Sequence, residues 1–210
     1  MWTLTKEQQQ KLTPQDAINL LKEGNKRFVN NLKLNRNLLQ QVNETSEGQF
    51  PFAVILSCID SRISAELIFD QGLGDIFSIR IAGNVLNEDI LGSMEFACKL
   101  SGSKLIAVIG HTKCGAIQGA CDNVKLGHLS TLLAKIKPAI ELTEQQFDRQ
   151  TTNKKDFLNE VTEINVHLVI KQILERSPVI KELVENKQVG IIGGIYHAET
   201  GEAIFDEYHA

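Results

Sequence analysis

Two short segments of the sequence carry residue types that bind metal ions and activate water. Residues 58–62 read Cys-Ile-Asp-Ser-Arg, and residues 111–115 read His-Thr-Lys-Cys-Gly. Thiolate and imidazole are common ligands of Zn(II), and a catalytic zinc ion keeps its fourth position for water or substrate. Cys58, His111 and Cys114 therefore predict a catalytic zinc site with three protein ligands.

Asp60 and Arg62 stand two residues apart beside the first of these predicted ligands. Arg62 can hold the Asp60 carboxylate in a charge-assisted pair and keep it ionised. Two thiolates and one neutral imidazole leave a Zn(II) centre formally neutral, so its bound hydroxide needs help from outside. We expect Asp60 to orient that hydroxide. Two alternatives stay open: Asp60 is the fourth zinc ligand in a closed site, or the pair only closes the loop.

Both segments follow apolar runs of strand length, which must position them. Nearly continuous apolar runs are typical of buried parallel strands, here residues 50–56, 76–81, 104–109 and 189–196. The helical stretches between them span residues 88–100, 126–146 and 157–174. Residues 203–205 predict an antiparallel edge strand. The fold class is α/β, with a short, mostly parallel sheet flanked by helices, and ligands of such sheets bind beyond the carboxyl ends of the strands.

The first part of the chain predicts an N-terminal helical arm, covering about residues 1–35. A helix is predicted over residues 14–32. Thr13 can cap its start, and Pro14 suits the first helical position. The polar stretch Gln40–Gly48 predicts a loop. With no repeats and no linker, residues 1–210 are expected to form a single domain.

Composition narrows the class of protein. The chain has 210 residues, 42% of them hydrophobic, and a net charge of -4, which disfavours nucleic acid as a partner. No apolar run is long enough to cross a membrane, and the first residues lack a secretory pattern, so we expect a cytoplasmic protein without membrane contact. Four cysteines are too few for a disulfide scaffold; Cys98 and Cys121 are expected to be packing thiols.

With these residues identified, the sequence resembles the β-class carbonic anhydrases. The two zinc-binding signatures of that family are Cys-x-Asp-x-Arg and His-x-x-Cys-Gly, which match residues 58–62 and 111–115 in the correct order. Residues 77–84 and 92–97 correspond as well. The resemblance extends from about Pro14 to Phe205, which is nearly the whole chain.

The resemblance implies one Zn(II) per subunit, held by Cys58, His111 and Cys114, and reversible hydration of CO2 to bicarbonate and a proton through zinc-bound hydroxide. It also implies a homodimer or a dimer of dimers, because the active sites of the family lie at a subunit interface. In the plant-like subgroup a glutamine nine residues before the first zinc cysteine binds substrate, which is Gln49 here. Phe77 matches the apolar wall beside the zinc.

Several points of this interpretation remain predictions. A backbone N–H near Gly115 is expected to orient the substrate oxygens. A second subgroup binds regulatory bicarbonate with a tryptophan three residues before the first zinc cysteine; Ile55 stands there, although Arg80 and Tyr196 match other members of that site. The plant-like subgroup is therefore favoured. Alternative functions are hydrolysis of CS2 or COS, and a noncatalytic zinc site with Asp60 as permanent ligand; a redox role is disfavoured because no Cys-x-x-Cys is present.

Overall fold

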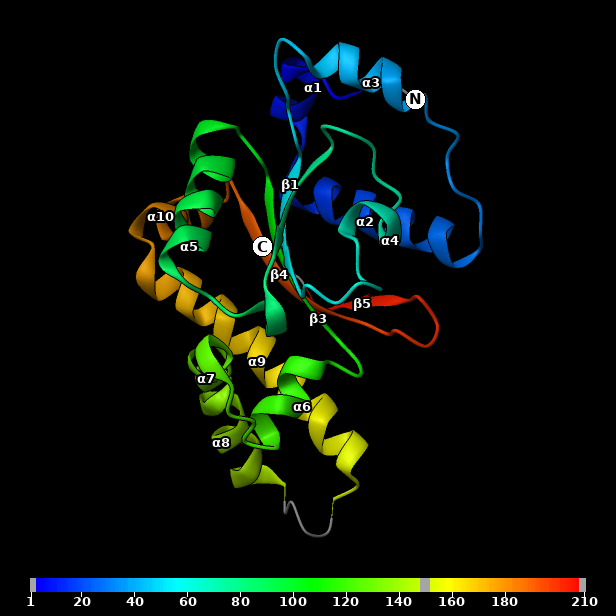
Figure 1. Cartoon of the computed structure of the whole chain (residues 1–210). Helices are drawn as coiled ribbons and strands as arrows, with labels where there is room; N and C mark the ends of the chain where they lie inside the picture. The colour runs from blue at the N-terminus through cyan, green and yellow to red at the C-terminus, as the bar shows by residue number, and fades with distance from the viewer. Residues whose placement is uncertain (1–2, 148–151, 208–210) are drawn as a thin grey trace.

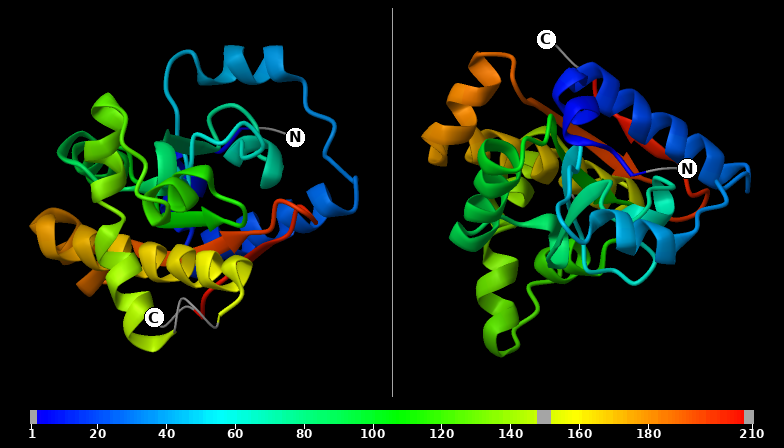
Figure 2. Two further views of the ribbon diagram at one scale, coloured as in Figure 1. Left: turned by 60° about the horizontal axis from the view of Figure 1, so that its bottom comes forward. Right: turned by 90° about the horizontal axis from the view of Figure 1, so that it is seen from above.

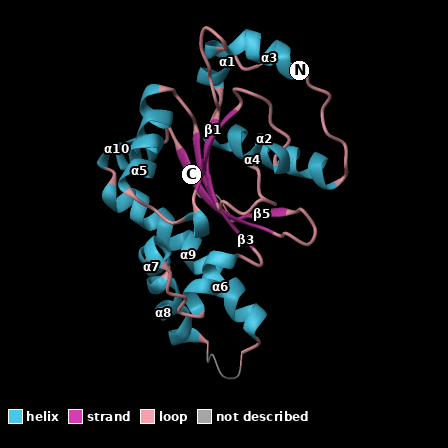
Figure 3. Cartoon of the chain, viewed as in Figure 1, coloured by secondary structure: helices cyan, strands magenta, loops and turns pink. Residues whose placement is uncertain are grey.

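The computed structural model describes residues 3–147 and 152–207, and within them five strands form one sheet (Figures 1 and 3). The order is β2-β1-β3-β4-β5, with neighbouring strands parallel except for β5, which is antiparallel to β4. The strands are β1 Ala53–Ser57, β2 Ile76–Arg80, β3 Leu105–His111, β4 Gly190–Tyr196 and β5 Ala203–Phe205. The predicted fold class and all five predicted strands are confirmed, with ends shifted by up to three residues.

Helices lie on both faces of this sheet. They are α1 Lys6–Lys11, α2 Pro14–Val29, α3 Leu38–Thr45, α4 Ala65–Ile68, α5 Glu88–Glu95, α6 Gly115–Cys121, α7 Gly127–Ala134, α8 Lys137–Gln146, α9 Lys154–Arg176 and α10 Pro178–Glu185. A 3₁₀ turn covers Ala82–Asn84, and a π-helical turn, Phe96–Leu100, continues α5. Among the described residues, no helix is long and apolar enough to cross a membrane.

The sheet separates two hydrophobic cores. Every residue of β1 and β3 is buried, which explains why both strands read as unbroken apolar runs. Helices α2 and α4 contribute to the core on one face, while α5, the C-terminal half of α9 and α10 contribute to the core on the other. Figure 1 shows the arrangement of these helices around the sheet. Each fully buried Ile or Leu contributes about 1.5–3 kcal/mol of transfer free energy, so the central strands are held firmly in place.

The N-terminal helix α2 forms as its sequence predicts. Thr13 and Asp16 make a reciprocal capping box at its start, with Pro14 at the first helical position. Ala17, Ile18 and Leu21 are fully buried under the sheet. The N-terminal arm is therefore anchored by its α2 face in the core.

Two predictions about the helices were wrong. Residues 40–48 are mostly helical, because α3 begins at Leu38 with an Asn37 cap; the polar composition hid this helix, whose one buried residue is Gln41. Its place at the periphery is visible in Figure 2. Residues 126–146 form two helices, α7 and α8, because Pro138 lacks an N–H and starts a new helix instead of continuing the old one.

Candidate metal centre

The three predicted metal ligands meet at the carboxyl ends of β1 and β3. In the parallel register of these neighbouring strands Ser57 pairs with Ile109, so Cys58 and His111 leave the sheet side by side. Cys114 follows a tight turn and stands at the N-cap of α6. Lys113 makes this turn with a φ of 57°. The ligand atoms of Cys58, His111 and Cys114 all lie within 4.8 Å of one another.

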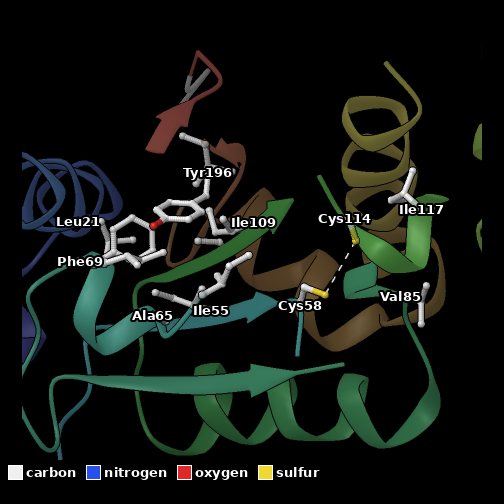
Figure 4. Packing of buried hydrophobic residues seen from close by; sticks show 14 of the residues in the cluster. Leu21, Ile55, Cys58, Ala65, Phe69, Val85, Ile109, Cys114, Ile117 and Tyr196 are labelled. Carbon is white, nitrogen blue, oxygen red and sulfur yellow. Dashed lines mark hydrogen bonds between the residues drawn. The ribbon is translucent and has the colours of Figure 1, made fainter. Parts of the chain in front are cut away.

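The chemistry of this group fits a metal ion. All three side chains are buried, and the two Sγ atoms lie 4.0 Å apart (Figure 4). The ring of His111 is oriented by Nδ1, 2.9 Å from the Thr112 carbonyl oxygen, while its buried Nε2 has no hydrogen-bond partner. A free imidazole nitrogen beside two thiols is the arrangement of a soft-ligand metal site with an oriented histidine. The prediction that these residues come together is confirmed.

The two thiols do not ionise alike. The hydrogen bond shared with Cys114 lowers the pKa of Cys58 to about 4 against the effect of burial, and His111 and the Gly83 amide assist. The same hydrogen bond, with burial, raises the pKa of Cys114. The shared hydrogen bond therefore favours loss of the first proton from the pair over loss of the second, and binding of a cation would release the protons that remain.

Asp60 and Arg62 form the predicted ion pair at the edge of this group. Arg62 Nε and Nη2 donate to the two carboxylate oxygens at 2.9 and 2.8 Å, and the Arg62 backbone N–H adds a bond of 3.0 Å. These hydrogen bonds hold the pKa of Asp60 well below its usual value. In this arrangement the Asp60 carboxylate is paired with Arg62 and is not part of the three-ligand group.

The structure adds Arg80 to the residues that shape the site. From the end of β2, its Nε donates to the Cys58 carbonyl oxygen at 3.1 Å and its Nη2 to that of Asp60 at 2.7 Å. Sequence reasoning noted Arg80 only as a resemblance to an anion site. Its place at the end of a strand adjacent to β1 was the signal that could have indicated this role.

A second brace supports the turn that carries His111 and Cys114. Thr112 Oγ1 donates to Glu199 at 2.6 Å, and Lys113 forms an ion pair with the same carboxylate at 3.3 Å. The hydrogen bond from Thr112 is the main reason that the pKa of Glu199 falls to about 2. The hairpin between β4 and β5 is thereby tied to the metal-binding turn.

The three predicted substrate-binding residues are not all brought to this centre within one chain. Gly115 opens α6 directly after Cys114, with open space around its α-carbon. Gln49 is exposed and precedes the amino end of β1, whereas Cys58 follows its carboxyl end. The five-residue strand between them is about 16 Å long. Phe77 lies on the edge strand β2, where it pairs with Val54 of β1. Together with Phe96 it lines a surface hollow of about 690 Å³.

A Cys-His-Cys centre at the strand ends of an α/β sheet, with a carboxylate held by an arginine beside it, defines a class of metal-dependent enzymes that activate water. The sequence model of a protein family described as carbonic anhydrase matches residues 53–203. Carbonic anhydrase 2 of Mycobacterium tuberculosis is 34% identical over 206 residues, covering 93% of this chain and 94% of its own. A carbonic anhydrase of Mycolicibacterium smegmatis is 32% identical over 197 residues, 90% of this chain and 91% of its own.

Solved structures agree with this result. A β-carbonic anhydrase of Aspergillus fumigatus superposes with a TM-score of 0.74 at 25% identity, over 80% of this chain and 81% of its own. A tetrameric β-carbonic anhydrase of Sordaria macrospora superposes with a TM-score of 0.72 at 25% identity, over 79% of this chain and 85% of its own. The chain belongs to the β-carbonic anhydrase family, and it is an enzyme that hydrates CO2 reversibly to bicarbonate and a proton.

Proposed function

We propose that the metal of this carbonic anhydrase is Zn(II), one ion per subunit, held by Cys58, His111 and Cys114. The observation that carries the proposal is a buried group whose ligand atoms all lie within 4.8 Å of one another, in which His111 Nε2 has no hydrogen-bond partner. Three protein ligands of this kind suit a catalytic zinc ion. When bound, Zn(II) supplies a Lewis acid that lowers the pKa of a water molecule.

Asp60 then orients the nucleophile. Its carboxylate stays ionised because Arg62 holds both oxygens. Oδ1 accepts two hydrogen bonds from Arg62, whereas Oδ2 accepts one and retains a lone pair that can accept a further hydrogen bond. Accepting a hydrogen bond from the attacking oxygen directs the oxygen's lone pair at the carbon of CO2. The backbone N–H of Gly115, in the first turn of α6, is proposed to stabilise the negative charge that develops on the substrate oxygens.

Gln49 and Phe77 are proposed to act on the site of a neighbouring subunit. Within one chain, Gln49 lies at the far end of β1 from the metal ligands, and Phe77 lies on the edge strand of the sheet. An exposed glutamine and a hollow lined by aromatic rings are what a second copy of the chain would cover. We therefore propose a homodimer or a dimer of dimers; the Sordaria macrospora relative is tetrameric. Sedimentation at several protein concentrations measures the assembly, and a monomer at all concentrations would contradict it.

Mixed dimers test where Gln49 acts. Cys58→Ser removes a metal ligand, and Gln49→Ala removes the amide, so both homodimers are expected to be impaired. In a mixed dimer, the intact metal centre of the Gln49→Ala subunit would receive Gln49 from the Cys58→Ser subunit. Activity of the purified mixed dimer near half that of the wild type supports the proposal. Activity equal to the average of the two parents would contradict it.

The function is tested by stopped-flow CO2 hydration and metal analysis on the same sample. We expect one zinc per chain, and a rate that falls on chelation and returns when zinc is added back. Bound zinc without hydration activity would contradict the catalytic assignment. We further propose that residues 1–210 act as one domain in the cytoplasm, where a reducing environment keeps the adjacent Cys58 and Cys114 thiols from oxidising.

A further inference from the structure

Asn165 is a polar residue on the buried face of α9. Asn165 is only 3% exposed, and the same buried face carries the apolar side chains of Val161, Val166 and Val169. A buried amide without a hydrogen bond costs about 1–3 kcal/mol. Asn165 avoids this cost by donating from Nδ2 to the carbonyl oxygen of Gly83, 3.0 Å away.

Gly83 in turn contacts the metal centre. Its backbone N–H donates to Cys58 Sγ at 3.4 Å, a normal distance for a bond to sulfur. Gly83 has a φ of 66°, and a Cβ there would lie 2.9 Å from Ile136 Cδ1. Glycine suits this position, and glycine is also the residue with the greatest backbone freedom. A hydrogen bond from outside the turn therefore helps to fix the direction of its N–H.

We propose that Asn165 is a positioning residue of the metal centre: by holding the Gly83 carbonyl, it aims the Gly83 N–H at the Cys58 sulfur. The inference rests on the metal site proposed above. An N–H bond to a thiolate withdraws electron density from sulfur and fixes the sulfur in space, as partners of metal ligands generally do. Gly83 lies in a segment 25 residues from Cys58, and Asn165 lies 82 residues further along the chain, so only the fold joins them.

The test compares two substitutions that each remove one buried hydrogen bond. Asn165→Leu keeps the approximate volume of the side chain but cannot donate to Gly83. Thr143→Val is the matched control, because Thr143 is fully buried on α8 and its Oγ1 donates within its own helix, to the Ala139 carbonyl oxygen. Both variants are expected to lose stability toward urea by comparable amounts.

Two readouts separate positioning from stability. With Co(II) in the site, we expect the thiolate-to-metal charge-transfer band of Asn165→Leu to move to longer wavelength, because the sulfur regains electron density; Thr143→Val should keep the wild-type band. Release of Zn(II) to a chelator should be about 10-fold faster in Asn165→Leu only. If Asn165→Leu matches Thr143→Val in both measurements, the residue is merely structural and the proposal is wrong.

A measurement on the wild-type protein covers the case in which Asn165→Leu does not fold. Ala82–Gly83 is the only Ala-Gly step in the sequence, so carbonyl-¹³C alanine with ¹⁵N glycine selects the Gly83 amide alone. With ¹¹³Cd in the site, we expect a scalar coupling between this amide proton and the metal, transmitted through the hydrogen bond to sulfur. Absence of the coupling would overturn the proposal. Failure of the wild type to bind any metal would instead contradict the metal site itself.

Discussion

Arg62 holds both oxygens of Asp60 in a two-pronged pair, with Nε 2.9 Å from Oδ1 and Nη2 2.8 Å from Oδ2. The same arginine points Nη2 toward the Lys113 carbonyl oxygen at 3.4 Å, in the turn between His111 and Cys114. Arg80 fixes the Asp60 backbone from the other side. The carboxylate is thus fixed in direction beside the metal ligands without being one of them.

Replacing Asp60 by Asn should abolish most of the activity while leaving the metal in place. The amide cannot accept as a carboxylate does and cannot pair with Arg62, so we expect a fall in kcat/KM of about 100-fold or more. Asp122→Asn, which removes an exposed carboxylate paired with Lys154, is the control and should behave as the wild type. Rates and zinc content are measured together; wild-type turnover in Asp60→Asn would reject the role of this residue.

Activity is expected to rise with pH above neutrality. Arg62 holds the pKa of Asp60 well below its usual value, so this carboxylate is ionised throughout the range from about pH 6.5 to 9 and cannot cause the rise. The cause is the formally neutral Cys-His-Cys ligand set, which acidifies water less than three histidines would. Stopped-flow rates across that range give the measurement, and a flat profile would contradict this reasoning.

Cys58→Ser should lose the metal, because an alcohol is a much poorer zinc ligand than a thiolate. Cys98 offers a matched control, since it is also buried and burial raises its pKa to about 12. Cys98→Ser should be less stable but should keep one zinc per chain. Metal analysis after gel filtration decides the matter, and full zinc occupancy in Cys58→Ser would show that the ligand is wrongly assigned.

A separate ion-pair cluster is expected to control stability. Asp70 is 4% exposed and accepts bonds from Arg27 Nε and Arg36 Nη1, both at 2.6 Å, and from the Leu34 N–H at 3.2 Å. Asp70→Asn tolerates the φ of 46° found there, but leaves the guanidinium groups without their anion. We expect the free energy of unfolding to fall by about 3–5 kcal/mol.

The pH dependence of this effect follows from the sign of the pKa shift. Burial alone would raise the pKa of Asp70, but the hydrogen bonds from Arg27 and Arg36 outweigh it and lower the pKa. The contribution is therefore present above the unfolded pKa of about 3.9 and is lost in acid. Urea titrations should show the wild type and Asp70→Asn converging below about pH 4. Glu7→Gln, at an exposed pair with Lys11, should cost less than about 1 kcal/mol; an equally small cost for Asp70→Asn would contradict the prediction.

Bicarbonate should inhibit only as a product, with a hyperbolic dependence on its concentration. Ile55 is fully buried in β1, where the regulated subgroup carries a tryptophan. Arg80 is engaged with two backbone carbonyl groups of the metal-binding loop. Initial rates at increasing bicarbonate measure the response, and a sigmoidal curve would contradict the prediction of the plant-like subgroup.

Much of the fold follows from local sequence. Continuous apolar runs predict strands buried on both faces, and Thr13 with Asp16 and Pro14 predicts the start of α2. The helix α3 escaped prediction because its buried position is filled by Gln41, whose side chain accepts from the Leu73 N–H. That contact depends on a segment far along the chain, so no pattern within residues 38–45 reveals it.

The cluster of candidate metal ligands was predictable, because Cys58, His111 and Cys114 carry their chemistry in their residue types and stand at the ends of predicted strands. The partners of those ligands were not. Arg80 reaches Cys58 only through the pairing of β1 with β2, and Gly83 and Asn165 approach it only through the packing of α9 on the sheet. Residue type and spacing therefore determined which groups do the chemistry, while tertiary structure alone decided what holds them, since hydrogen bonds between distant segments exist only once the core has brought those segments together.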